Sequence, residues 1–227
     1  MRANKVIAKI IGLVIVALLF FGIKNYLSAS NFPVKKVQIF AAGEHLASDL
    51  LSETISKYLR DGFFYLKINQ LKQDLLNDPW IYAVAIKRKW PDTLVVSLVE
   101  QQAFLKWGEA ALVNPKGEVF VPAFNTIPEQ LPVVFGKEEF KPEIIKLYQQ
   151  ATVLLAPLGL IVTKVIFNDN HYWEITFSDG MVVFLKESDP LNQLELLTKL
   201  YRRIIGNRTT HPKTIDLRYS SGMAVKW

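Results

Sequence analysis

Residues 79–100 read PWIYAVAIKRKWPDTLVVSLVE, and this stretch predicts two antiparallel strands joined by a tight turn. After the turn, Leu94, Val96 and Leu98 occupy every second position, which is the period of a half-buried strand. The tripeptide WPD separates the two runs, because proline presets the turn backbone and aspartate hydrogen-bonds its own backbone. We therefore expect strands near residues 82–88 and 93–99.

The residues before this hairpin predict one more strand and two helices. A strand is expected near 34–40, and Ser48 is placed to cap a helix with an apolar face. A second, shorter helix is expected to begin at Asn69 and to end before Pro79. The order strand, helix, helix, strand, strand predicts a three-stranded sheet covered on one face by two helices, within a domain at 33–100.

The residues after the hairpin predict a second domain at 103–227, a mixed β-sheet with flanking helices. One helix is expected over 142–155, and another is expected from Asp189, with Pro190 in its first turn, to Gly206. The fold class is therefore α+β. The expected strands lie near 103–106, 110–113, 118–121, 131–135, 161–167, 172–177, 181–185, 214–219 and 223–227.

The N-terminal segment is apolar enough to cross a membrane. Residues 10–23 contain no charge, and residues 6–27 form about 33 Å of helix at about 1.5 Å per residue. Lys9 and Lys24 can extend toward the headgroups, and Tyr26 suits the interface. We expect residues 1–5 to be a basic cytoplasmic tail and 6–27 a transmembrane helix. A cleaved signal peptide is the alternative, because residues 28–30 (Ser-Ala-Ser) provide small residues at cleavage spacing.

The net charge of +6 does not indicate a nucleic-acid-binding protein. Four of the 27 basic residues and none of the 21 acidic ones lie within residues 1–30, so the rest of the chain carries only +2. The other basic clusters are short and are typical of solvated faces. We expect no nucleic-acid partner.

No pattern in the chain indicates catalysis. The chain contains no cysteine, so a thiol nucleophile and a cysteine-based zinc site are excluded. His45, His171 and His211 are far apart, lack metal-ligand spacing and are expected on loops or the surface. No nucleophile elbow, phosphate loop or dinucleotide fingerprint occurs. We expect a protein that is not an enzyme and that holds no cofactor or metal.

The last expected strand ends at the last residue, Trp227, and it alternates Met223, Val225 and Trp227 with Gly222, Ala224 and Lys226. A strand at a sheet edge leaves backbone groups to which a partner can add its own strand. Tyr219 and Trp227 are of the type that dominates interface energy, and Arg218 could pair with a partner's carboxylate. The same two aromatic residues would equally fit the core of the domain.

Three ordered blocks of residues resemble the FtsQ/DivIB family of bacterial cell-division proteins, across the anchor and both exported parts. The second block is VNPKG at 113–117, and the third is DLRYSSGMAVKW at 216–227. The first and most specific block comprises Pro79-Trp80-Ile81, Val84, Ile86, Arg88, Trp90-Pro91-Asp92, Leu94 and Leu98-Val99-Glu100.

The resemblance implies a POTRA domain followed by a β domain, in a single-pass type II protein of the Gram-negative inner membrane, at the division septum. It implies a divisome scaffold that links early and late division proteins, binding FtsB, which is paired with FtsL, through the β domain, and other divisome proteins through the POTRA domain. The family's FtsB contact maps onto Arg218, Tyr219, Ser221, Gly222 and Trp227. Our hypothesis of strand addition adds Met223 and Val225 of the terminal strand.

Three other classes of protein are alternatives to this interpretation. A POTRA-containing outer-membrane secretion or assembly component needs a barrel of at least about eight strands of about nine residues each, for which 103–227 has no room. A secreted periplasmic binding protein would follow from cleavage of the N-terminal segment. A periplasmic cell-wall enzyme would need a carboxylate pair, serine or metal constellation, and the sequence shows none.

Overall fold

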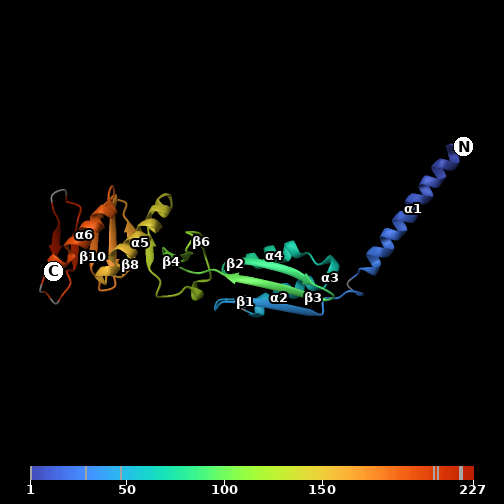
Figure 1. Cartoon of the computed structure of the whole chain (residues 1–227), viewed down its shortest axis with the longest axis horizontal. Coiled ribbons are helices and arrows are strands. Elements are labelled where there is room, and N and C mark those ends of the chain that lie inside the picture. The colour runs from blue at the N-terminus through green and yellow to red at the C-terminus, as the bar shows by residue number, and fades with distance from the viewer. Residues whose placement is uncertain (1, 29, 47, 207, 209, 220–221) are drawn as a thin grey trace. The chain divides into compact units, whose positions relative to one another are not determined.

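The computed structural model describes residues 2–28, 30–46, 48–206, 208, 210–219 and 222–227 (Figure 1). The chain divides into two compact units, Met1–Gln101 and Gln102–Trp227. The first unit contains the N-terminal helix and a small sheet with helices, and the second contains a larger mixed sheet with two long helices. The α+β class predicted from the sequence is confirmed.

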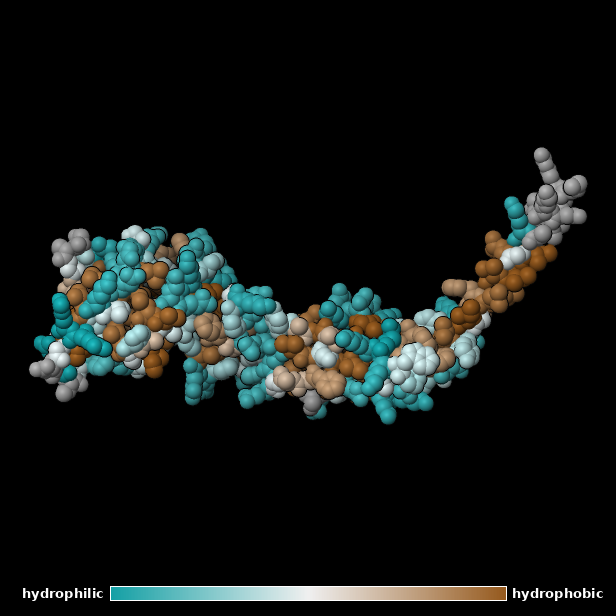
Figure 2. Space-filling model, viewed as in Figure 1, coloured by the Kyte–Doolittle hydropathy of each residue, from teal (hydrophilic) through white to brown (hydrophobic). Residues whose placement is uncertain are grey.

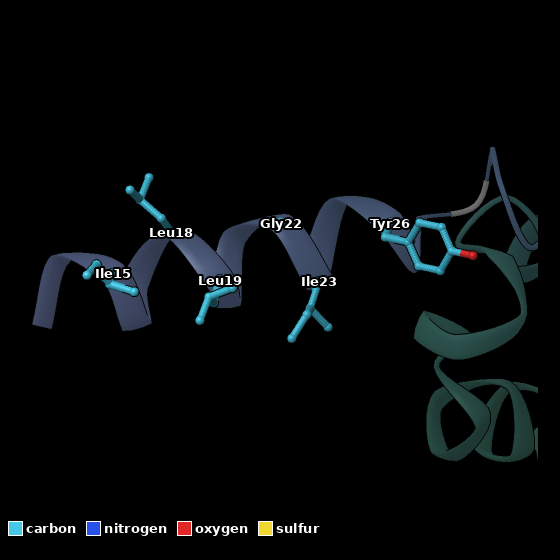
Figure 3. Close-up of a pocket in the computed structure, with 6 residues that line it drawn as sticks. All are labelled: Ile15, Leu18, Leu19, Gly22, Ile23 and Tyr26. Atoms are coloured by element: carbon cyan, nitrogen blue, oxygen red, sulfur yellow. The ribbon is translucent and has the colours of Figure 1, made fainter. Parts of the chain in front are cut away.

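The N-terminal helix α1 (Arg2–Tyr26) contains a window, Lys9–Tyr26, whose length and composition suit a membrane span. Its mean hydropathy is 1.8, and none of this window is buried in the protein. Figure 2 shows the continuous hydrophobic band that results. In Figure 3, Ile15, Leu18, Leu19 and Ile23 project from the helix, and Gly22 leaves a shallow groove between them. A retained anchor and a cleaved signal peptide both contain such a helix, so the helix is consistent with either alternative.

The first unit contains the predicted three-stranded sheet, with strand order β1-β3-β2. Strand β1 pairs in parallel with β3, and β2 pairs with β3 in antiparallel fashion. Alternate β3 residues, Leu94 among them, pack with Leu51, Ile55 and Leu71 of the helices. The elements are β1 (Lys36–Ala42), α2 (Ser48–Leu59), α3 (Gly62–Tyr65), α4 (Ile68–Leu76), β2 (Ile81–Lys89) and β3 (Thr93–Glu100).

Two local predictions for this unit were wrong. Asn69 does not cap the second helix, because α4 begins at Ile68 and Lys67 occupies the cap position. The short helix α3 was not predicted, because tertiary contacts stabilise it. The Arg88 guanidinium, from β2, donates hydrogen bonds of 2.6 and 2.8 Å to the carbonyls of Phe63 and Leu66. These bonds satisfy carbonyls at the end of a helix too short to be stable alone.

The second unit is built on a nine-stranded mixed sheet with strand order β12-β11-β10-β9-β8-β7-β4-β5-β6. Its core joins the inner faces of the central strands to α5 and α6, which pack against each other and against the sheet. The strands are β4 (Leu105–Trp107), β5 (Ala111–Val113), β6 (Val119–Phe120), β7 (Val133–Phe135), β8 (Val162–Phe167), β9 (Tyr172–Phe177), β10 (Val182–Lys186), β11 (Thr214–Asp216) and β12 (Ala224–Lys226), and the helices are α5 (Lys141–Leu155) and α6 (Pro190–Ile205), with 3-10 turns η1 (Phe124–Thr126), η2 (Glu138–Phe140) and η3 (Ala156–Leu158).

The last two strands are shorter than predicted. Strand β11 ends at Asp216, because the backbone N–H of Arg218 turns back to the Asp216 carboxylate at 3.0 Å. Strand β12 covers 224–226 of the predicted 223–227. The expected cap of α6 is also different. Asp189 holds the N-cap position, but its carboxylate makes no capping bond and accepts a bond from Asn192 Nδ2 at 3.1 Å.

Candidate partner-binding edge strand

Strand β12 forms one edge of the nine-stranded sheet. It pairs only with β11, in antiparallel register, with Val225 opposite Ile215 and Ala224 opposite Asp216. No strand of the described residues pairs with its other side. An edge of this kind presents backbone N–H and C=O groups that an added strand can use.

The two faces of β12 differ in burial. Met223 and Val225 are half-buried and pack against the core of the second unit. Ala224 and Lys226, at the alternate positions, are exposed. The apolar face therefore fixes the strand to the domain, while its outer edge stays unpaired among the described residues.

The two large aromatic residues of the predicted site are exposed. Tyr219 is 59% exposed and Trp227 is 37% exposed, so the alternative that they are core aromatics is wrong. The guanidinium of Arg208 lies 4.1 Å from the centre of the Trp227 ring, in the geometry of a cation–π contact. The sequence did not point to Arg208, because no spacing rule connects residue 208 with residue 227.

Arg218 is engaged within its own chain. Its Nε and one terminal nitrogen donate to the two carboxylate oxygens of Asp216 at 2.9 and 2.7 Å. The same guanidinium lies over the rings of Tyr172 and Phe184, at 4.7 and 5.0 Å from their centres. The hydrogen bond from Arg218 lowers the pKa of Asp216, and the same bond raises the pKa of Arg218. The contact holds the chain where it leaves β11, close to the candidate site.

The described members of the predicted site lie on a single hairpin. Arg218 and Tyr219 follow β11, Gly222 and Met223 lead into β12, and Trp227 follows it. Gly222 is exposed. The predicted contact residue Ser221 lies outside the described residues. The arrangement leaves the backbone groups of one strand edge and two aromatic rings exposed.

All three histidines lie on loops, as expected, but His45, between β1 and α2, is only partly exposed. The ring of His45 stacks on that of Trp80 at 3.7 Å, and its Nδ1 lies 2.7 Å from Glu100 Oε1. His171 and His211 are exposed, and each contacts a single carboxylate, of Glu187 and Asp179 respectively. Within the part of the chain that the structure describes, no group of three or more potential metal ligands is found.

Comparison with known proteins gives two family matches. The family model described as "POTRA domain, FtsQ-type" matches residues 32–101. The model described as "Cell division protein FtsQ/DivIB, C-terminal" matches residues 105–218. The second match ends at residue 218, before β12 begins.

Curated relatives resemble the chain along most of its length. "Cell division protein FtsQ" of Coxiella burnetii is 26% identical over 224 residues, covering 99% of this chain and 92% of the relative. The proteins of that name from Hahella chejuensis and Neisseria gonorrhoeae are 28% and 25% identical, covering 86% and 90% of this chain and 70% and 84% of the relatives.

The fold and the open edge define a class of protein: an N-terminal apolar helix, a POTRA domain, and a mixed sheet that ends in an exposed strand. The family matches then define the particular group. The chain belongs to the FtsQ/DivIB family of cell division proteins.

Proposed function

We propose that the protein is a membrane-anchored, non-catalytic scaffold of the divisome that captures FtsB, paired with FtsL, by strand addition on β12. The observation that carries this proposal is the position of β12, at the sheet edge and beside two exposed aromatic side chains, Tyr219 and Trp227. An added strand would gain backbone hydrogen bonds from β12 and apolar contact from both rings.

The residues of the site contribute in different ways. Met223 and Val225 keep β12 on the domain, and Arg218 fixes the chain before it, so the edge is preorganised and loses little entropy on binding. Tyr219 and Trp227 contact the partner. Gly222, which leads into β12, is a small exposed residue that lets a partner strand approach closely, and the neighbouring Ser221 of the sequence is included in the proposed contact.

The proposal includes placement in the cell. Helix α1 is retained as a single-pass type II anchor in the inner membrane, with residues 1–5 in the cytoplasm and the two units in the periplasm at the division septum. The POTRA domain contacts other division proteins. If α1 were instead a cleaved signal peptide, a chain that begins at Asn31 would appear in the soluble periplasmic fraction rather than in the membrane fraction, and this part of the proposal would be wrong.

Co-purification of FtsB and FtsL with full-length variants tests the partner surface. Trp227→Ala and Tyr219→Ala should each weaken capture by about 2 kcal/mol, or roughly thirtyfold in Kd, as for central aromatic residues of an interface. Phe124→Ala is the matched control, because Phe124 is 79% exposed in the same unit. It lies in η1, which follows β6, and β6 is at the opposite edge of the sheet from β12. Unchanged capture by both test variants, with folding intact, would show that the terminal strand is not the contact.

A further inference from the structure

The part of the first unit that follows α1 contains aromatic side chains in continuous contact. The ring of Tyr26, on the last turn of α1, lies 5.6 Å from that of Phe32, which lies 5.0 Å from that of Phe64. Phe64 contacts Phe63 at 5.5 Å, and Phe63 contacts Trp90 at 6.5 Å. These contacts link the end of the apolar helix to the turn between β2 and β3.

Two aromatic residues of this region remain exposed. Trp90 is 69% exposed and Tyr65 is 42% exposed, whereas Phe63, whose ring contacts that of Trp90, is buried. The Tyr65 hydroxyl donates to the carbonyl of Lys24 at 3.3 Å, so this side chain lies beside the last turn of α1. Exposed Trp and Tyr next to the end of a span are typical of the membrane interface, where one part of the ring is apolar and the other wet.

Three lysines surround the same turn. The backbone N–H of Lys35 donates to the carbonyl of Asp92 at 2.9 Å. Lys36 and Lys89 lie on either side of Thr93 in the register of the sheet. All three lysine side chains are exposed, and among the described residues none of them forms an ion pair. We call Tyr65, Trp90, Lys35, Lys36 and Lys89 the turn-end surface.

The carboxylates near the turn-end surface leave a positive excess. Asp61 lies 4.0 Å from Lys67, which offsets its charge. Asp92 is half-buried and accepts a bond of 3.2 Å from the hydroxyl of Thr93. Lysines without ion-pair partners, next to exposed aromatic rings, are complementary to an anionic bilayer, in which negatively charged headgroups cover an apolar layer.

We propose that the turn-end surface rests on the membrane crossed by α1 and binds its anionic lipid headgroups. Its aromatic rings would enter the interface, and its lysines would contact lipid phosphates. The contacts from Tyr26 to Trp90 place this surface within reach of the bilayer, and a soluble protein partner would need no such continuity with the span. The inference rests on the anchoring part of the proposed function and is independent of partner capture at β12.

The test uses the full chain in lipid nanodiscs, with anchoring checked first by co-flotation with vesicles. Because the chain has no cysteine, Lys89→Cys and Asn77→Cys each give a single site for a nitroxide label. Lys89 is the last residue of β2 and Asn77 precedes the first, so the two sites lie near opposite ends of a strand of nine residues, which is roughly 26 Å long. Nickel(II) held on a chelating lipid headgroup then reports how closely each label approaches the membrane surface.

In nanodiscs containing phosphatidylglycerol, we expect nickel relaxation to be several-fold stronger at residue 89 than at residue 77. Trp90→Ala should reduce it with any lipid. Lys36→Glu should reduce it with phosphatidylglycerol but not with phosphatidylcholine alone, and added salt should act in the same way. The matched controls, Phe124→Ala and Lys72→Glu, change exposed residues elsewhere and should have no effect.

Three results would overturn the inference. Equal relaxation at the two labels would place the turn away from the bilayer. Strong relaxation at residue 89 that neither variant changes would mean that the tether to α1 alone accounts for proximity. If the chain failed to float with vesicles, α1 would not be a membrane anchor. This result would be independent of any loss of FtsB capture.

Discussion

The guanidinium of Arg218 holds both carboxylate oxygens of Asp216, two residues earlier in the chain, by hydrogen bonds of 2.9 and 2.7 Å. This fork-shaped pairing sits where β11 ends and the chain turns toward β12. Arg218 therefore links the stability of the domain to the shape of the candidate binding edge, and it does so through a group that titrates in acid.

Stability of the second unit should depend on the ionisation of Asp216. Arg218 depresses the pKa of this carboxyl in the folded state, so its stabilising contribution is present above the unfolded value of about 4 and is lost as pH falls through the folded value. We expect Asp216→Asn to reduce stability at pH 7 by about 1 kcal/mol, since the pair is partly exposed. In denaturant titrations the loss should shrink as pH falls below about 4 and through the lowered pKa of Asp216. An equal loss at every pH would contradict this assignment.

Strand addition should change hydrogen exchange at β12. The amides of residues 222–227 on the outer edge are free to exchange in the isolated protein, because β11 covers only one side of the strand. Adding the FtsB–FtsL complex should slow exchange in this segment by at least about tenfold, since each newly paired amide must open before it exchanges. Residues 172–177 of β9, in the middle of the sheet, serve as the control and should not change. Protection that appears elsewhere and leaves 222–227 unaffected would contradict strand addition.

Arg88 should be important for the POTRA fold. Its guanidinium donates to the carbonyls of Phe63, Phe64 and Leu66 at 2.6, 3.2 and 2.8 Å, and these bonds tie α3 to β2. We expect Arg88→Ala to destabilise the unit by roughly 2 kcal/mol, because three carbonyls lose a charged donor.

The neighbouring lysine provides the control for Arg88. Lys87 is exposed on the opposite side of the strand, so Lys87→Ala should change stability by less than about 0.5 kcal/mol. Arg88→Lys should recover only part of the loss, because an ammonium cannot reproduce the fork of donors. Similar denaturation midpoints for Arg88→Ala and Lys87→Ala would rule out this role.

Gly43 should tolerate no side chain. A Cβ at this position would overlap the carboxylate of Glu100, whose other oxygen lies 2.7 Å from Nδ1 of His45. Gly43→Ala should therefore displace Glu100 and destabilise the first unit by about 1 to 3 kcal/mol, the range for overpacking. The penalty should be smaller in a Glu100→Ala background, measured as a double-mutant cycle. An identical penalty in both backgrounds would mean that the clash lies elsewhere.

Local patterns in the sequence were sufficient for most elements. The alternation of Leu94, Val96 and Leu98 and the WPD turn predicted β2, β3 and the covered face correctly, because each depends on neighbours in the chain. Predictions failed where distant residues decide the outcome. Helix α3 exists through the bonds from Arg88, and β11 ends early through the bond from the backbone N–H of Arg218 to the Asp216 carboxylate.

The candidate site divides in the same way. The sequence by itself determined that the chain has an apolar N-terminal helix, two α+β units and a terminal strand with aromatic residues, because composition and periodicity are local properties. Only the tertiary structure decided that β12 lies at the sheet edge, that Tyr219 and Trp227 are exposed, and that Arg208 lies over Trp227. Strand order and exposure arise from pairing between residues far apart in the chain, and no local pattern specifies them.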